Sequence, residues 1–447
     1  MNILKETPVD SVLKSDVEFV KKISYFSRLF PIIFFIIYLS VTVILFAYGP
    51  WDWPVEDGLK LYIFLSLAHL ALFSGYISAA FGRPKKYSGL FSVNRLLYFS
   101  IFINLILLLP TSLSRSGSII PDIGSAINDL GAAYMDSNEM RIELGGGVTE
   151  YIRIVFSPII FLLVPLTLFY WERFGVVAKL LSLLSIFGFL AIYVSIGTNK
   201  ALADFVLLTL ALVVARLFSG KTKLGWRRIV LFLSIAVLAL SMFFQFFSST
   251  IASRLKSEEG AFTFSALNLQ ADTENGFISF LPIEIKVGAV ALITYVTQGY
   301  YALYLSLDEP FVPMFGVGNS RFLTHNAEKI SGIQDLSLMT YPGRIEKRGW
   351  DSSVQWTTIY PWIASDVSFL GALLIVFLIG RLFAMSWLDT IDGNNPFAIA
   401  IFSQLIIILF YFPANNQAMQ SGEGFFAFFG LLIFWIYTRK SYFPRGV

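Results

Sequence analysis

Uncharged apolar runs recur along most of the chain, each about twenty residues long, which is the length needed to cross a lipid hydrocarbon layer. Lipid offers backbone N–H and C=O groups no hydrogen-bond partner, so each run is predicted to pair its own backbone as an α-helix. The pattern therefore predicts an all-α, polytopic membrane helical bundle. It places ten spans at residues 30–49, 59–81, 95–111, 151–171, 175–196, 201–219, 228–247, 361–381, 396–413 and 422–438.

Residues 285–307 form a further apolar run that is long enough to be an eleventh span. The run contains polar and small residues such as Thr294, Gln298 and Gly299, which a lipid-facing helix does not need. Counting it as a span would also move Arg381 to the side opposite the other basic connections. We therefore expect a re-entrant or interfacial helix whose polar groups find partners inside the protein, with a true span as the alternative.

Basic residues are concentrated in alternate short connections between the predicted spans. Residues 83–95 and 216–228 are rich in Lys and Arg, as is the C-terminal segment 439–445, whereas residues 49–58 and 414–421 contain neither. Short loops rich in Lys and Arg stay on the cytoplasmic side of a membrane. We therefore expect both termini to be cytoplasmic.

This orientation places the two long connections, residues 111–150 and 248–360, on the outer side. The first of them is predicted to contain a short surface helix near residues 119–134. Residues 1–28 carry lysines among apolar residues at helical spacing and are predicted to form an amphipathic segment on the cytoplasmic surface. No internal repeat or soluble second domain is found, so residues 1–447 are predicted to form a single membrane domain.

Composition supports this class and excludes several kinds of chemistry. Hydrophobic residues make up 56% of the chain and charged residues 14%, compared with about 25% charged residues in soluble domains. The net charge of +3 gives no reason to expect a nucleic acid partner. The absence of cysteine excludes disulfides, thiolate metal sites and a cysteine nucleophile. The two histidines lie far apart without metal-ligand spacing, so neither a metal nor a cofactor is expected.

The candidate substrate-binding residues are basic residues of the outer segments. The large connection 248–360 contains 8 basic and 11 acidic residues, so a generally positive surface does not account for them. Arginine side chains match phosphate oxygens with two parallel hydrogen bonds, and lysine provides a point charge. The basic residues expected to bind a diphosphate are Lys200, Arg141, Arg321, Arg344, Lys347 and Arg348.

An acid, a histidine and aromatic residues complete the candidate site. Asp366 opens a predicted span, where a carboxylate caps the helix, orients an arginine or acts as a general base; the first two roles are favoured. His325 lies in the large connection and is the other candidate base, although an ordinary exposed histidine is the alternative. Tyr300 and Trp350 are candidates for contact with sugar rings, and an interfacial aromatic belt is the alternative for such residues.

Three features together resemble the Wzy-type O-antigen polymerases, which are oligosaccharide repeat-unit polymerases. They are the basic residue in the short turn 197–200, the long outer connection before the last three spans, and the motif from Ser365 to Gly371, which is similar to the aspartate, aromatic and glycine pattern of that family. The family usually has arginine where this chain has Lys200. The resemblance covers most of the chain as topology but few residues as motif.

The resemblance implies a GT-C-like glycosyltransferase of the bacterial inner membrane that requires no metal. It would polymerise undecaprenyl-diphosphate-linked oligosaccharides at the periplasmic face, releasing undecaprenyl diphosphate. Its expected partners are these lipid-linked oligosaccharides, the lipid bilayer and a membrane protein that regulates chain length. Two alternatives stay open, an O-antigen ligase and a transporter or flippase of lipid-linked sugars. The few ionisable residues at mid-depth and the lack of an inverted repeat count against a transporter.

Overall fold

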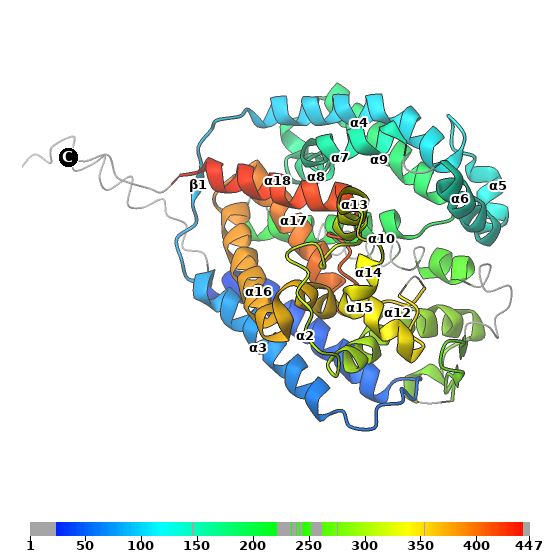
Figure 1. Ribbon diagram of the computed structural model, residues 1–447. Coiled ribbons are helices and arrows are strands. Elements are labelled where there is room, and N and C mark those ends of the chain that lie inside the picture. Colours follow the sequence, from blue (N-terminus) through cyan, green and yellow to red (C-terminus); the bar gives the residue numbers. More distant parts are fainter. Residues whose placement is uncertain are drawn as a thin grey trace, which may run out of the picture.

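The computed structural model describes residues 24–440 except 145–146, 221–233, 235–237, 239–240, 242–243, 252–261, 275 and 353. These residues form a predominantly helical body, as the sequence predicts (Figure 1). Within the described ranges, seven segments are long and apolar enough to cross a membrane. They are α2 (Tyr25–Tyr48), α3 (Leu59–Ala80), α4 (Val93–Ser116), α7 (Val148–Ile160) with α8 (Leu163–Phe169), α9 (Val176–Ser195), α10 (Lys200–Phe218) and α16 (Ile359–Ile391).

The last two predicted spans are shorter helices, α17 (Pro396–Phe410) and α18 (Gly422–Thr438). Most of the span predicted at 228–247, and residues 1–23 of the amphipathic segment, lie outside the described residues. The span predicted at 151–171 is divided into α7 and α8. Pro165 has no amide hydrogen to donate to the carbonyl of Phe161, which explains why α7 does not continue unbroken at this point.

Helix α17 forms the centre of the bundle. Every residue from Pro396 to Leu409 is buried, and the helix packs against α8, α10, α16 and α18. Asn395 caps its first turn by accepting hydrogen bonds from the amides of Phe397 and Ala398 at 3.0 and 3.4 Å. An apolar helix that is buried on all sides is typical of a bundle core.

Helices α3 and α16 lie side by side and make the most extensive pairing in the fold (Figure 1). Two glycines allow their backbones to approach closely. A Cβ atom on Gly75 would lie 1.9 Å from the carbonyl oxygen of Phe377, and one on Gly380 would lie 2.2 Å from that of Leu72. Small residues at such crossings let helices pack without a hydrophobic driving force between them in lipid.

At one end of the bundle, the connection after α3 is tied to the segment after α18. Strand β1 (Lys86–Tyr87) pairs antiparallel with β4 (Arg439–Lys440). The fully buried carboxylate of Asp389 accepts hydrogen bonds from the Lys85 amide, the Trp435 indole and the Arg439 guanidinium at 2.8, 2.9 and 2.6 Å. Two of the basic segments that the sequence assigns to one common side, 83–95 and 439–445, are therefore neighbours in the fold.

The connection at 111–150 contains two helices, α5 (Ile123–Asn128) and α6 (Leu130–Leu144), in place of the single helix predicted at 119–134. The chain breaks at Asp129, whose φ and ψ of −147° and 87° are not helical. Asp129 accepts a hydrogen bond from the amide of Ala132 at 3.0 Å, so its side chain begins α6.

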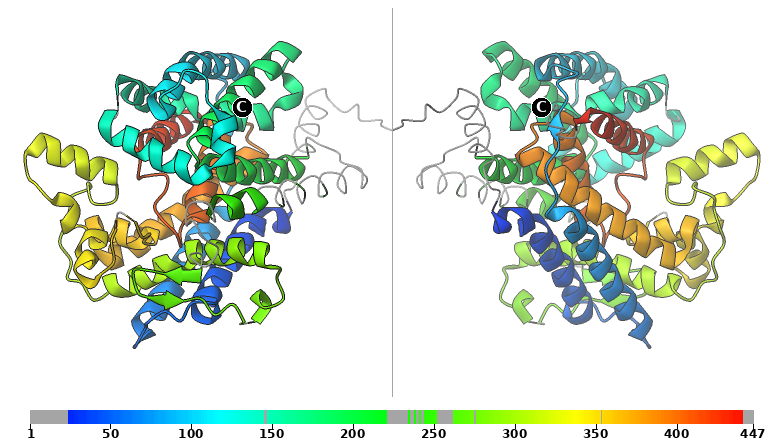
Figure 2. Two further views of the ribbon diagram at one scale, coloured as in Figure 1. Left: turned by 90° about the vertical axis from the view of Figure 1, so that its right-hand side faces the viewer. Right: turned by 90° about the vertical axis from the view of Figure 1, so that its left-hand side faces the viewer.

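The large connection is folded against the end of the bundle at which α16 and α18 begin, which we call the large-loop end. The elements of the large connection are β2 (Thr263–Phe264), β3 (Leu269–Gln270), η3 (Gly276–Ile278), α12 (Ile283–Ser306), α13 (Arg321–Ser331), α14 (Leu336–Met339), α15 (Tyr341–Arg344) and η4 (Ile345–Arg348). Outside this connection, a short 3₁₀ helix, η1 (Trp171–Arg173), lies between α8 and α9. The segment that carries α13 and α14 projects from the body (Figure 2).

Helix α12 corresponds to the ambiguous run 285–307 and is packed against α2, α3, α15 and α16. Its polar side chains have partners within the protein. Thr294 accepts a hydrogen bond from the Trp51 indole at 2.7 Å, and the hydroxyls of Tyr300 and Thr42 lie 2.8 Å apart. These contacts match the expected burial against protein, and the re-entrant or interfacial assignment stays a prediction.

Candidate functional site

The first turns of α16, Ile359 to Asp366, support the part of the large connection that carries most of the predicted site. We call them the α16 platform. The Ser365 carbonyl accepts the Met314 amide at 3.1 Å, and its hydroxyl accepts the Tyr341 amide at 2.9 Å. The platform therefore fixes the chain at two places, before α13 and at the start of α15.

Asp366 holds the turn that precedes α13. One carboxylate oxygen accepts the amides of Gly316 and Gly318 at 2.8 and 2.9 Å. The other accepts the amide and the side-chain amide of Asn319 at 3.0 and 2.6 Å. Successive amides that converge on an anion form a backbone nest, and here the anion belongs to the protein itself. Helix α16 begins at Ile359, so Asp366 does not cap its start, and both carboxylate oxygens hold the turn that leads to Arg321 instead of contacting an arginine.

The helix is interrupted two residues after Asp366. Ser368 has φ 65° and ψ 171°, a conformation that costs a residue with a side chain about 1–3 kcal/mol. The α16 platform is consequently set off from the remaining length of α16. Backbone conformations of this cost persist where the surrounding contacts determine them, here the four hydrogen bonds to Asp366.

Arg321 begins α13 directly after this turn and lies on the α16 platform. Its guanidinium carbon is 5.6 Å from the centre of the Trp362 ring, and the group donates to the carbonyl of Ser352. Its amide donates to the Gln420 side chain at 3.2 Å, and Gln420 belongs to the turn 411–421 between α17 and α18. Burial holds the pKa of Arg321 below its usual value, opposed by Glu346 and Asp351, and an arginine remains charged at neutral pH in such a site.

Arg344 closes α15 and is partly buried. Its guanidinium carbon lies 4.4 Å from the centre of the Tyr341 ring, and Nη1 donates to the carbonyl of Pro310. Nε and Nη2 are buried and have no hydrogen-bond partner among the described residues. An unpaired buried donor costs about 1–3 kcal/mol, so this side chain is prepared for an acceptor that the described residues do not provide.

Lys347 and Arg348 differ from Arg344 because both are paired with carboxylates. Lys347 Nζ lies 2.8 Å from Glu309 Oε2, and Arg348 Nε lies 3.2 Å from Glu309 Oε1. Glu309 is 2% exposed, whereas Asp308, 3.8 Å from Arg348, is half-exposed. These two cations therefore balance a buried carboxylate, which is a structural use of their charge.

Lys200 begins α10 and lies beside the turn 411–421. Its Nζ is 2.5 Å from Asp204 Oδ2 and 5.6 Å from the centre of the Tyr411 ring. Asp204 also accepts the Tyr411 hydroxyl at 3.0 Å, and the Tyr295 ring packs on that of Tyr411 at 6.2 Å. The neighbouring Asp204 already offsets the charge of Lys200, so a ligand has to compete with this carboxylate.

His325 and Arg141 are not placed with these residues. The His325 side chain is 63% exposed on α13, with Nδ1 3.9 Å from Glu328 Oε2. It lines a shallow surface pocket of about 350 Å³ together with Lys329 and Asp335. Arg141 lies in α6, and its side chain is outside the described part of the structure.

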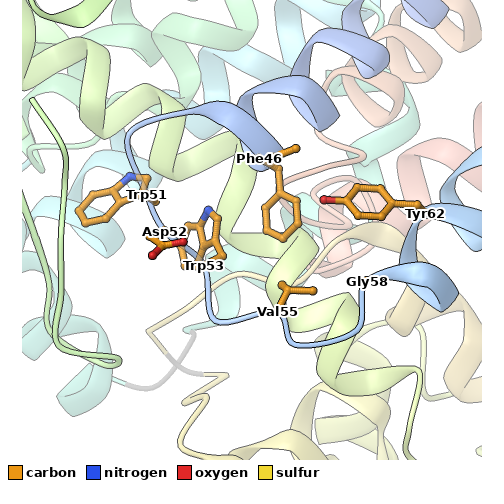
Figure 3. Close-up of a pocket in the computed structure, with 8 residues that line it drawn as sticks. Phe46, Trp51, Asp52, Trp53, Val55, Gly58 and Tyr62 are labelled. Carbon is orange, nitrogen blue, oxygen red and sulfur yellow. The ribbon is translucent and has the colours of Figure 1, made fainter. Parts of the chain in front are cut away.

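Tyr300 and Trp350 are fully buried in an aromatic cluster. The Tyr300 ring packs on that of Phe46 at 5.6 Å. Trp350 packs on Phe264 at 5.7 Å and on Tyr301 at 5.5 Å. Both predicted sugar-contacting residues therefore lie behind other aromatic side chains. The outer surface of this cluster lines a pocket of about 220 Å³ between α2 and α3 (Figure 3).

A group of four charged residues at the same end did not enter the predicted site. Arg115 donates to both oxygens of Glu150 at 2.9 and 3.0 Å and to Glu423 at 2.7 Å. Arg153, only 2% exposed, donates to both oxygens of Glu423 at 2.8 Å. The group joins α4, α7 and α18 beside the turn 411–421. Its one sequence signal is that Arg153 and Glu423 lie close to the starts of predicted apolar spans, where an ionised residue requires a partner.

The five predicted site cations whose side chains the structure describes fall into two classes. Lys200, Lys347 and Arg348 contact carboxylates, whereas Arg321 and Arg344 do not and both lie on or beside the α16 platform. The described part of the chain contains no group of three or more His, Asp or Glu side chains placed to bind a metal ion. Comparison with known proteins gives no match, either to a family model, to a curated protein or to a solved structure.

Proposed function

We propose that this chain is a GT-C-like membrane glycosyltransferase that polymerises undecaprenyl-diphosphate-linked oligosaccharide repeat units into O-antigen or a related surface polysaccharide. In this proposal the large-loop end faces the periplasm of a bacterium, and the helices lie in its inner membrane. The growing chain is the donor, a lipid-linked repeat unit is the acceptor, and undecaprenyl diphosphate is the leaving group.

The observation that carries the proposal is that two of the three guanidinium nitrogens of Arg344, Nε and Nη2, lack a described hydrogen-bond partner. Both nitrogens are buried, and no described carboxylate lies within salt-bridge distance of Arg344. A diphosphate offers several charged acceptor oxygens, and arginine binds such oxygens with two parallel hydrogen bonds. Arg321, which also has no described carboxylate in contact, provides the second cation on the α16 platform.

The reaction requires that charge be stabilised on the departing diphosphate. The acceptor hydroxyl oxygen forms a bond to the anomeric carbon, while the bond from that carbon to the diphosphate oxygen breaks and its electrons move to the diphosphate. Fixed cations that face the developing charge lower the barrier because they need no reorganisation during the reaction. Arg344 and Arg321 are proposed for this role, and the hydroxyl proton passes to a carboxylate or to water.

Asp366 is proposed as a positioning residue. Its carboxylate accepts four hydrogen bonds from the turn before α13. Asp366 therefore fixes the position from which Arg321 extends. Lys200, beside Tyr411 of the turn 411–421, contributes a further cation if the diphosphate displaces the Asp204 carboxylate from the Lys200 ammonium.

The test is to incubate the purified protein, held in lipid nanodiscs, with synthetic undecaprenyl-diphosphate repeat units and to separate the products by gel electrophoresis. A ladder of chain lengths is the expected result. A single-length product formed only on a lipid A-core acceptor would identify an O-antigen ligase instead. Substrate that crosses the bilayer of a reconstituted vesicle without chemical change would identify a flippase.

A further inference from the structure

The pocket at the connection between α2 and α3 has the composition of a ligand site, and no predicted function has been assigned to it. Its volume is about 220 Å³, and it is lined by Phe46, Ala47, Trp51, Asp52, Trp53, Val55, Gly58 and Tyr62 (Figure 3). This is smaller than the roughly 300–1,000 Å³ typical of sites for drug-sized molecules. The space suits a single small ring.

The aromatic residues of this pocket are held as part of the protein interior. Trp51 and Trp53 are only 4% and 7% exposed, so neither is an interfacial anchor. Tyr48, one turn away at the end of α2, is 81% exposed and is typical of such an anchor. The Trp51 indole donates to Thr294 of α12 at 2.7 Å, which fixes this side of the pocket.

Large-loop residues support the pocket from behind. Phe264 of β2 packs on Trp53 at 5.2 Å and on Trp51 at 6.0 Å. Tyr301 of α12 stacks on Trp53 at 5.9 Å with an angle of 21° between the rings. The pocket wall is therefore rigid and continuous with the aromatic cluster that contains Trp350.

The polar groups of the pocket define what it can bind. Nε1 of Trp53 is buried below the pocket surface, so a ligand in the pocket does not reach it. Asp52 is exposed at the rim and offers acceptors to a donor. Tyr62 directs its hydroxyl toward the Phe46 ring (Figure 3). A hydroxyl group both donates and accepts, whereas an anion would be repelled by Asp52.

We propose that this pocket binds one sugar ring of the glycan, with the ring placed among Phe46, Trp53 and Tyr62 and its hydroxyls bonded to the exposed carboxylate of Asp52. The sugar comes from the substrate of the proposed polymerase, and to that extent the inference rests on the proposed function. The pocket is separate from the α16 platform, so it acts as a subsite that holds the chain away from the reacting sugar.

The experiment measures binding of single sugars, which needs no polymerisation. Saturation-transfer difference NMR is recorded on the full protein in nanodiscs with the methyl glycosides of glucose, galactose, mannose, rhamnose and N-acetylglucosamine, at millimolar concentration. At least one glycoside is expected to give signals. Asp52→Asn is expected to weaken its binding by about tenfold or more, because a hydrogen bond to a charged group is lost. Val55→Trp, which fills the pocket, is expected to abolish it.

Matched variants separate the pocket from general damage. Glu56→Gln removes a neighbouring carboxylate that does not line the pocket, and Val41→Trp adds an indole to the exposed outer face of α2; both are expected to keep the NMR signals. Elution volume in size-exclusion chromatography verifies that each variant is folded.

Three outcomes overturn the inference. They are the absence of signals from every glycoside, signals that survive Val55→Trp, and binding of choline without binding of any glycoside. The last would show that the aromatic wall and Asp52 form a site for a cation. If the pocket does not bind sugars, the polymerase can still produce a ladder of chain lengths. If no ladder forms, the NMR experiment still measures whether the pocket binds sugars.

Discussion

Asp366 accepts two hydrogen bonds from the same residue, Asn319, one from its backbone amide at 3.0 Å and one from its side chain at 2.6 Å. The residues lie on different elements, and their contact fixes the turn from which α13 and Arg321 begin. The position of Arg321 thus depends on a carboxylate that lies outside α13.

The first prediction concerns this contact. Asp366→Asn places an amide group beside the Asn319 donors and removes the negative charge, so we expect amide hydrogen exchange at residues 316–319 to accelerate by about tenfold or more. Asn319→Ala removes one of the four hydrogen bonds and is expected to have a smaller effect in the same direction. Polymer synthesis should fall in both variants.

Asp392→Asn, at the other end of α16, is the control and should leave exchange in the turn unchanged. An Asp366→Asn variant with normal exchange but no polymer would instead assign Asp366 to the chemical step.

The second prediction concerns the cations. Arg344→Ala and Lys200→Ala are expected to abolish the polymer ladder, because each removes a charge proposed to stabilise the departing diphosphate. Arg344→Lys should restore little, since an ammonium cannot replace two parallel N–H donors. Arg381→Ala removes an exposed arginine of α16 that donates to Ser78 at 3.1 Å and serves as the control. Normal ladders from both Arg344→Ala and Lys200→Ala would rule out a diphosphate site at these residues.

The third prediction concerns the buried group around Glu423. Glu423→Gln leaves Arg115 and Arg153 without their shared carboxylate, and breaking a buried pair in this way costs about 3–5 kcal/mol. We expect a corresponding drop in the free energy of unfolding in detergent. The double variant with Arg153→Met should lose less than the sum of the two single variants, because both residues act through one contact. Additive losses would contradict the network.

The fourth prediction concerns the crossing of α3 and α16. Gly380→Ala forces a methyl group to within 2.2 Å of a backbone oxygen, so the helices must separate. Overpacking of this kind typically costs about 1–3 kcal/mol, and a thermal unfolding curve measures it. Gly175→Ala is the control, since a Cβ atom there meets no heavy atom within 4 Å and its φ is −67°. Equal melting temperatures for Gly380→Ala and the wild type would show that the two helices lie farther apart at this crossing than in the structure.

The fifth prediction concerns orientation. The chain contains no cysteine, so single cysteine variants report without background. Ile330→Cys, 87% exposed on α13, should react with a membrane-impermeant reagent in spheroplasts, whose inner membrane faces the medium, whereas Leu90→Cys, 54% exposed at the opposite end, should react only after lysis. The reverse pattern would invert the proposed topology.

The helix positions were predictable because a long uncharged run has few structures open to it. The bounds of α2, α3 and α9 lie within a few residues of the predicted spans. The division between α7 and α8 could also be predicted, since Pro165 is visible in the sequence. The pairing of Lys86 with Lys440 could not be predicted, because two-residue strands carry no recognisable sequence pattern.

The candidate site was predictable as a set of residue types but not as a set of contacts. Arg344, Lys347 and Arg348 look alike in sequence, and only the fold shows that Glu309 pairs with the last two and not with the first. Trp350 was predicted to contact a sugar ring, yet the packing of Phe264 and Tyr301 buries it completely. Contacts between residues so far apart in the chain depend on packing that local pattern does not encode.

The tie that Asp389 forms with Lys85, Trp435 and Arg439 restricts how the bundle can admit a lipid tail. At that end, the chain leaving α3 and the chain leaving α18 cannot part without breaking three hydrogen bonds to a buried carboxylate and the β1–β4 pair. If the proposed lipid-linked substrate enters between the helices, this end would stay closed. The gap would then open at the large-loop end, where the proposed diphosphate site lies.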